Sequence, residues 1–240
     1  MKKQGLNFLT SLVIVMTTGF MLNSCIAQGI KGSGDVVKEE RQIGSFNAIE
    51  VGGAFDIILK QGTAEKCMVE ADDNLIGYIV TEVKGNTLKI YQEKGFRDAG
   101  ELNLYISFVE LENIEISGAA ELEAKDKLEL GDFGLIASGA SEVEMELEAA
   151  IIRLNISGAT EVKMKGNADK LKGDFSGASE FDGWDLKVKE AEIEASGSSD
   201  VEINVSEELK IDASGASSVD FKGNPRVMKH VSGAADVDQN

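Results

Sequence analysis

Twelve carboxylates recur at two fixed positions of a short repeated phrase, and they are the residues of this chain best suited to chemistry. The phrase reads Ser-Gly-Ala-x-acid-Val-acid. Its first acidic position, in which Ser218 is the exception, holds Glu121, Glu142, Glu161, Glu180, Asp200 and Asp236. Its second, in which Lys163 is the exception, holds Glu123, Glu144, Asp182, Glu202, Asp220 and Asp238. Because carboxylate oxygens at this density suit calcium, a metal or ligand face is one hypothesis.

A solvated face is the alternative interpretation of these acidic rows. Like charges directly opposed on neighbouring strands repel, but water and salt screen them over a Debye length of about 8 Å. Calcium-binding β-rolls repeat about every nine residues with a Gly-Gly-x-Gly-x-Asp pattern. The phrase found in this chain has one invariant glycine and a much longer period. We therefore expect no obligatory cofactor, with calcium kept as a hypothesis.

Catalysis has weak support in the sequence. Glycosidases use a convergent pair of carboxylates, whereas these carboxylates form regular rows. The single histidine, His230, lies in the last coil, and no serine of the phrase has a base nearby to activate it. Cys67 lies in a strand-like run and reads as a buried small hydrophobe, and Trp184 is the sole tryptophan. We expect no enzyme, and a polysaccharide-active β-helix is the least favoured alternative.

The spacing of the phrase indicates the elements that position the carboxylates. Seven copies follow one another in steps of 18 to 21 residues, which fits one coil of a parallel β-solenoid. The phrase begins with the structural pairs Ser117 and Gly118, Ser138 and Gly139, Ser157 and Gly158, Ser176 and Gly177, Ser196 and Gly197, Ser214 and Gly215, and Ser232 and Gly233. We expect each glycine to form a bend where a side chain would collide with the next coil, and each serine to form a corner ladder.

Equivalent positions of stacked coils should form ladders about 4.8 Å apart. The position between the two acids is expected to point inward and build the core, and it holds Leu122, Val143, Val162, Phe181, Val201, Val219 and Val237. A faint earlier copy, residues 52–57, aligns with residues 117–122, and the intervening residues would hold about three less regular coils. The tripeptide Lys-Gly-Asn occurs at residues 84–86, 165–167 and 222–224, and it predicts the same kind of tight turn at each place. A short helical turn is predicted over residues 72–76.

The N-terminal residues read as an export signal. Lys2 and Lys3 precede an uncharged apolar run, residues 8–22, which predicts a signal peptide over residues 1–24. Leu22-Asn-Ser-Cys25 resembles the lipobox of bacterial lipoproteins, in which the cysteine becomes lipid-modified, so Cys25 is the expected lipid attachment site. Cleavage after Ala27, which would free a soluble protein, and an uncleaved membrane helix are the alternatives. Without Cys25, Cys67 has no partner for an internal disulfide.

These observations divide the chain into three parts. After the signal peptide, residues 25–45 are expected to form a tether and an N-terminal cap, with residues 26–34 as a flexible tether. Residues 46–240 are expected to form a single β-solenoid, with irregular coils over residues 46–110 and seven regular repeats over residues 111–240. The net charge of −18 argues against nucleic acid and against electrostatic attraction to an anionic membrane. Contact with the membrane would therefore depend on the lipid.

The chain resembles the putative auto-transporter adhesin head domain family in four features. These are the lipobox, the opening Phe46-Asn-Ala-Ile-Glu-Val-Gly-Gly-Ala-Phe-Asp-Ile57, the Asp72-Asp-Asn-Leu75 segment and the serial Ser-Gly-Ala phrases. The resemblance covers roughly residues 35–240. It implies a right-handed parallel β-helix, shaped like the pectin lyases but without their catalytic residues, and a role in cell adhesion.

The expected function is therefore a non-catalytic, lipid-anchored envelope protein of a Gram-negative outer membrane, with a secreted or periplasmic protein as the alternative location. Its repetitive acidic face would bind a glycan or a matrix protein. The competing function is a structural spacer that associates with itself end to end, because open coils expose strand edges that can pair.

Overall fold

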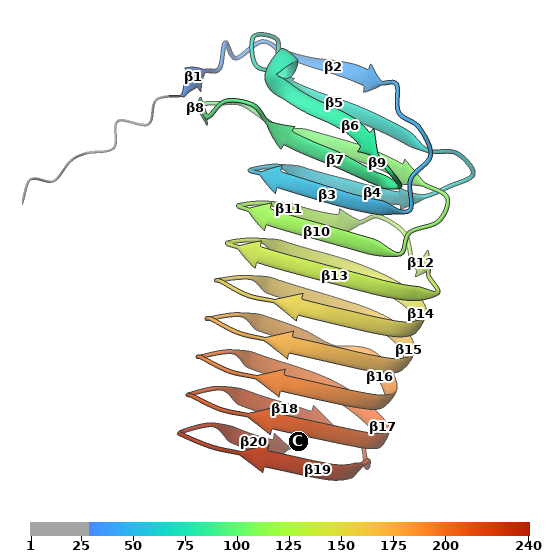
Figure 1. Cartoon of the computed structure of the whole chain (residues 1–240), viewed down its shortest axis with the longest axis vertical. Helices are drawn as coiled ribbons and strands as arrows, with labels where there is room; N and C mark the ends of the chain where they lie inside the picture. The colour runs from blue at the N-terminus through green and yellow to red at the C-terminus, as the bar shows by residue number, and fades with distance from the viewer. Residues whose placement is uncertain (1–28) are drawn as a thin grey trace, which may run out of the picture.

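Residues 29–240 are described by the computed structural model, and they form an elongated stack of coils with a cap at one end (Figure 1). The predicted signal peptide, Cys25 and residues 26–28 lie outside the described residues. Within residues 29–240, no helix has the length and apolar composition needed to cross a membrane. The parallel β-solenoid expected from the repeat is confirmed by the pairing of its strands.

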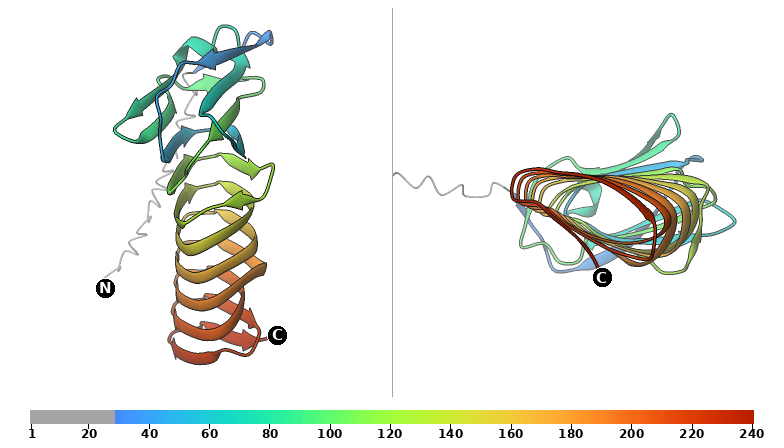
Figure 2. Two further views of the ribbon diagram at one scale, coloured as in Figure 1. Left: turned by 90° about the vertical axis from the view of Figure 1, so that its right-hand side faces the viewer. Right: turned by 90° about the horizontal axis from the view of Figure 1, so that it is seen from below.

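The regular coils pair in parallel with the coils above and below them. Their strands are β10 (Asn113–Gly118), β11 (Glu121–Ala124), β12 (Leu128–Glu129), β13 (Asp132–Gly139), β14 (Glu142–Ile156), β15 (Glu161–Phe175), β16 (Glu180–Ala195), β17 (Asp200–Ala213), β18 (Ser218–Lys222), β19 (Arg226–Val231) and β20 (Asp236–Gln239). Seen along the stack, each coil is a flattened loop with two long sides (Figure 2). The long strands β14 to β17 run along one side, bend, and return along the other.

We name the two sides by the charges that they carry. The acidic wall consists of residues 56–61, 121–124, 142–149, 161–168, 180–188, 200–205, 218–222 and 236–239. The ion-pair wall consists of residues 48–53, 113–118, 132–139, 151–156, 170–175, 190–195, 208–213 and 226–231. The Ser-Gly-Ala phrase forms the corner that leads from the ion-pair wall to the acidic wall.

The predicted inward ladder forms the core behind the acidic wall. Its seven members pair in consecutive register, from Leu122 to Val237, and none is more than 6% exposed. Full burial of each such side chain contributes roughly 1.5–3 kcal/mol. The largest member, Phe181, also packs against Phe175, with ring centroids 5.3 Å apart. This apolar stack fixes the register, and it therefore fixes where the flanking carboxylates point.

The corner glycines have the role expected from the sequence. All seven have positive φ, between 74° and 107°. A Cβ atom on any of them would lie less than 3.0 Å from the carbonyl oxygen of the glycine in the preceding coil. Glycine is therefore required at this corner both by the backbone conformation and by the closeness of the coils.

The faint earlier copy stacks directly on the regular repeats. β3 (Ala48–Gly53) pairs with β10, and β4 (Asp56–Gln61) pairs with β11, so that Gly53 lies beside Gly118 and Ile57 beside Leu122. The alignment was correct, but the expectation of about three intervening coils was wrong. Residues 62–112 leave the stack and return to it on the far side of β3 and β4.

The returning segment contributes one more parallel rung and an antiparallel cap. β7 (Thr87–Gln92) and β9 (Asn103–Phe108) extend the two walls, whereas β2 (Val36–Arg41), β5 (Lys66–Asp72) and β6 (Ile79–Lys84) pair antiparallel. The antiparallel pairing of β6 with β7 follows from the loop between them, because the two-residue turn Gly85-Asn86 is so short that it forms a hairpin. Gly166 and Gly223 also have positive φ, but they lie within the coil pathway and not in a hairpin, so the three Lys-Gly-Asn segments do not form the same turn.

The expected flexible tether is wrong for residues 29–34. β1 (Ile30–Lys31) pairs with β8 (Phe96–Arg97), and the predicted helical turn is followed by the short 3-10 helix η1 (Ile76–Tyr78). The fully buried carboxylate of Asp72 accepts hydrogen bonds from the backbone N–H of Gly34, at 3.0 Å, and of Gly100, at 2.9 Å. Asn74 accepts from the backbone N–H of Ser33 and donates to the carbonyl of Lys31. These bonds fasten the start of the described chain to the cap.

Candidate binding faces

The acidic wall places both predicted rows of carboxylates on its outer face. Glu121, Glu142, Glu161, Glu180 and Asp200 are successive partners in one ladder and are all exposed. The ladder continues through Ser218 to Asp236, and Asp56 extends it at the other end, which sequence reasoning missed. The second row runs in the same order through Glu123, Glu144, Lys163, Asp182, Glu202, Asp220 and Asp238.

Lysines neutralise the second row only in its first coils. Lys165 lies 2.9 Å from Glu144, and Lys163 lies 3.6 Å from Asp182. The hydrogen bond from Lys165, followed by its charge, lowers the pKa of Glu144. Farther along the stack the row is crowded with like charges. Partial burial, followed by the charges of Asp182, Asp200, Asp220 and Glu180, raises the pKa of Glu202.

The rows do not converge on a point. Within residues 29–240, no three or more histidine, cysteine, aspartate or glutamate side chains are grouped so that they could hold a metal ion. The rows run parallel to the axis of the stack, with at most one carboxylate per row in each coil. Calcium on this wall therefore remains a prediction that would require ligands from neighbouring coils or from a partner.

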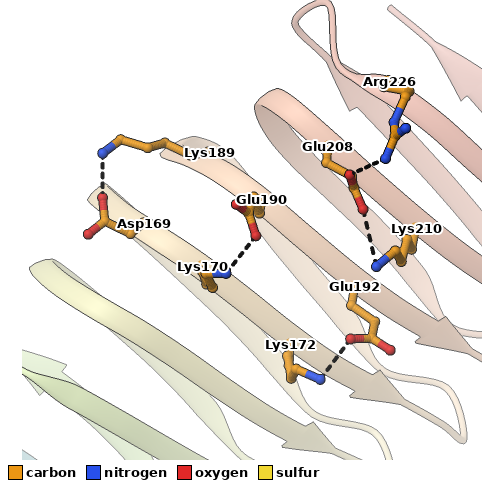
Figure 3. Close-up of polar contacts among 9 residues, drawn as sticks. All are labelled: Asp169, Lys170, Lys172, Lys189, Glu190, Glu192, Glu208, Lys210 and Arg226. Atoms are coloured by element: carbon orange, nitrogen blue, oxygen red, sulfur yellow. Dashed lines mark hydrogen bonds and ion pairs between the residues drawn. The ribbon is translucent and has the colours of Figure 1, made fainter.

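The ion-pair wall has a different arrangement of charge, in which cations and carboxylates of successive coils face each other (Figure 3). Lys170 lies 2.7 Å from Glu190, and Lys172 lies 2.7 Å from Glu192. Glu208 is contacted by Arg226 at 2.6 Å and by Lys210 at 3.1 Å. At the bend before this wall, Lys189 lies 2.6 Å from Asp169.

These pairs shift the pKa values in the stabilising direction. The hydrogen bond from Arg226, followed by that from Lys210, lowers the pKa of Glu208, and Lys172 lowers that of Glu192. Sequence reasoning missed this wall, although a signal existed: Lys170-Leu-Lys172 and Glu190-Ala-Glu192 are separated by one coil length. Much of the basic charge is therefore paired on the ion-pair wall, which leaves the other wall acidic.

The serines that begin the phrase lie at the corner, where backbone N–H groups make the regular contacts between coils. A hydroxyl row that sequence reasoning missed lies three residues later and is buried, and it comprises Ser141, Thr160, Ser179, Ser199 and Ser217. Ser141, Thr160 and Ser217 donate back to the phrase, as in the 2.8 Å bond from the Thr160 hydroxyl to the carbonyl of Ser157, whereas the buried hydroxyls of Ser179 and Ser199 have no hydrogen-bond partner among residues 29–240. The small size and the burial of these side chains indicate packing at the corner and not nucleophilic chemistry.

The thiol and the imidazole are far apart in the fold. Cys67 is fully buried on β5 of the cap, as predicted, and burial raises the pKa of its thiol to about 11. His230 lies exposed on β19, in the last coil at the opposite end of the stack (Figure 1). Cys67 and His230 therefore cannot act together as nucleophile and base.

Residues 45–225 match the family described as "Putative auto-transporter adhesin, head GIN domain". The chain belongs to this family. The match covers the rung built from β3 and β4, most of the cap and all but the last coil of the stack. Membership supports an adhesin-like protein of the cell surface or envelope.

Solved structures share the fold of this family member at low sequence identity. A putative adhesin from Bacteroides fragilis has a TM-score of 0.83 and 22% identity, over 88% of this chain and 100% of its own. A putative lipid binding protein from Parabacteroides distasonis has a TM-score of 0.74 and 20% identity, over 89% and 100%. A putative adhesin from Parabacteroides merdae has a TM-score of 0.73 and 20% identity, over 88% and 99%. The comparison with curated proteins gives no match.

Proposed function

We propose that this protein is a non-catalytic, lipid-anchored adhesin of the cell envelope, and that the acidic wall is the surface that binds its partner. One observation carries the proposal: two carboxylate rows repeat along the acidic wall, whereas on the opposite wall lysines pair with carboxylates of neighbouring coils, as Lys170 does with Glu190 and Lys172 with Glu192. A row of like charges that recurs along the stack at the cost of charge repulsion is better explained by binding than by folding.

The dimensions of the acidic wall suit a repetitive partner. Seven coils about 4.8 Å apart extend over roughly 33 Å. The same carboxylate positions recur in each coil, so an extended glycan or a repetitive matrix protein could meet equivalent contacts along its length. The absence of a convergent carboxylate pair among the described rows favours binding over glycoside hydrolysis.

The lipid anchor would also orient the stack. The chain is fastened to the cap from Gly29 onwards, since Arg97 donates to the carbonyl of Gly29 and Asn74 donates to that of Lys31. Cys25 precedes Gly29 by four residues, which span at most about 14 Å when fully extended. A lipid on Cys25 would therefore hold the cap against the outer membrane of a Gram-negative bacterium and direct the coils away from it.

The experiment is a binding screen of the mature chain without the lipid, against a panel of glycans and host matrix proteins, once in millimolar calcium and once in chelator. We expect saturable binding to at least one class. Loss of binding in chelator would place calcium between the acidic rows and the partner. If nothing binds in either condition, the adhesin proposal fails.

A second candidate function, self-association, is favoured by the last coil. All six residues of β19 are exposed, among them the apolar Val227, Met228 and Val231. An exposed strand edge with apolar side chains can pair with a second copy. Light scattering tests this: a molar mass that rises with concentration would favour the structural spacer, and a constant monomer mass would exclude it.

A further inference from the structure

A groove runs across the coils at the bend that joins the acidic wall to the ion-pair wall. Its volume is about 680 Å³, and small side chains such as Ala149, Ala168 and Val188 line it. One continuous ladder, contributed by successive coils, forms a polar rim of Glu129, Glu148, Asn167, Lys187 and Asn204. The groove therefore offers an extended ligand one polar side chain per coil along its length.

Trp184 lies where the stack departs from its repeat. Gly183 pairs with Ile203 and Lys187 pairs with Asn204, so residues 184–186 have no partner on β17 and form a bulge. The side chain of this sole tryptophan is partly exposed. Since a bulge interrupts pairing and redirects side chains, bulges are common beside functional sites.

The contacts of Trp184 connect it to the rim of the groove. Asn204 is a rim residue, and its side-chain amide lies 3.5 Å from the carbonyl oxygen of Trp184. Lys222 is the next member of the same ladder after Asn204, and its ammonium lies 5.2 Å from the centroid of the indole ring. Asp182, from the second acidic row, accepts the backbone N–H of Trp184 at 3.2 Å. Trp184 is not one of the residues that line the groove, but it lies on the acidic wall beside the groove, in contact with the rim residue Asn204 through its backbone carbonyl.

We propose that this groove binds a chain of neutral sugars, with one sugar ring stacked on Trp184. The face of a pyranose ring carries C–H groups, which pack on an aromatic ring as apolar surface does. Its hydroxyls need donors and acceptors, and the amides of Asn167 and Asn204 supply both, while Lys222 donates and the rim carboxylates accept.

The negative charge around Trp184 favours the binding of neutral sugars over that of anionic sugars. The chain carries a net charge of −18, and Asp182, Asp185 and Glu202 lie near Trp184 in the sequence and the strand register. Such a surface repels uronates and sulfated sugars. The inference rests on the proposed function, because it names the ligand class of the same adhesin and locates the contact at the edge of the acidic wall.

The fluorescence of the sole tryptophan tests this inference directly. The full chain in detergent is titrated with the hexasaccharides of cellulose, mannan and chitin, and affinities are measured independently by calorimetry. We expect a saturable change in Trp184 emission with at least one of them. Trp184→Leu should weaken binding at least tenfold, and Trp184→Tyr, which keeps an aromatic face, should retain it within about threefold. Lys172→Met, on the opposite wall, is the matched control and should leave affinity unchanged.

Three results would overturn the inference: no binding of any neutral hexasaccharide, an unchanged affinity in Trp184→Leu, or equal losses in Trp184→Leu and Trp184→Tyr. Far-ultraviolet circular dichroism of each variant confirms that the fold is retained. If the chain binds a matrix protein or an anionic glycan while the neutral sugars fail, the adhesin proposal stands and the sugar site does not. If no ligand of any class binds, both are refuted.

Discussion

The backbone of Gly197 stacks so closely on Gly177 that a Cβ atom on Gly197 would lie 2.7 Å from the Gly177 carbonyl oxygen. Gly197 also has a φ of +74°, which costs a residue with a side chain additional strain. Gly197→Ala should therefore lower the free energy of unfolding by about 2 kcal/mol or more, as measured by urea denaturation. Gly131→Ala is the control, because nothing lies within 4 Å of its Cβ position. Equal stability of the two variants would contradict this account of the corner.

The crowded carboxylate Glu202 gives a pH-dependent prediction. Its pKa is raised above the ordinary value of 4.5, first by burial and then by the charge of Asp182. The folded chain therefore binds this proton more tightly than the unfolded chain, and ionisation of Glu202 lowers stability as the pH rises above 4.5. Glu202→Gln should raise the free energy of unfolding at pH 7 by about 0.5 kcal/mol. The gain should disappear below pH 4.5, where both states are protonated.

Glu208 provides the opposite case on the ion-pair wall. Its pKa is lowered, first by the hydrogen bond from Arg226 and then by that from Lys210, so its contribution to stability is present above pH 4.5 and is lost as the pH falls. Glu208→Gln should therefore lower stability at pH 7, by a small amount because solvent screens this exposed network. Denaturation curves at pH 4 and pH 7 compare both variants. Shifts of the same sign at pH 7 would show that the two walls do not differ electrostatically.

The buried carboxylate of Asp72 should determine whether the start of the described chain stays on the cap. Asp72→Ala leaves the N–H groups of Gly34 and Gly100 without their acceptor, so the chain loses two of the hydrogen bonds that hold it on the cap. We expect hydrogen exchange at residues 30–35 to accelerate more than tenfold, with little change in the distant coils. Asp73→Ala is the control, because Asp73 accepts only from the exposed Ser33 hydroxyl. Unchanged exchange in Asp72→Ala would contradict the fastening described above.

The two cysteines allow a matched test of the lipid anchor. Cys25→Ser should abolish incorporation of a labelled fatty acid and release the protein from the membrane fraction. Cys67→Ser should retain both, because Cys67 is buried in the cap. Labelling that persists in Cys25→Ser would contradict the lipoprotein assignment, and the orientation of the stack would then lose its basis.

The sequence predicts the regular coils well because every coil repeats the same physical constraint. The glycine at each corner and the apolar residue at each inward position are visible as a period, and even the divergent Gly53 and Ile57 are found in the correct register. The antiparallel pairing of the cap is not predicted, because alternation of apolar residues over 79–84 and 87–92 is the same for parallel and antiparallel pairing. Whether two neighbouring strands pair parallel or antiparallel depends on the length of the loop between them, and the loop here is the two-residue turn Gly85-Asn86.

The binding surfaces are only partly predictable for a related reason. The acidic rows follow from register, and the Lys172 and Glu192 pair could have been found from the same spacing. The bulge at Trp184 could not have been found from the sequence. The 20-residue step from Ser176 to Ser196 shows that this coil is longer than the previous one, but it does not show where the extra residue lies. Its position depends on which inward side chains keep their register, and that is a property of the packed core.

The central claim, that the acidic wall is the binding surface, is tested most directly by neutralising one wall at a time. The triple variant Glu142→Gln, Glu161→Gln and Glu180→Gln changes three exposed neighbours of the acidic wall. The triple variant Glu190→Gln, Glu192→Gln and Glu208→Gln makes the same net change on the ion-pair wall. Affinity for the partner found in the screen should fall at least tenfold in the first variant and change less than twofold in the second. Equal affinities, or a loss confined to the ion-pair wall, would contradict the claim.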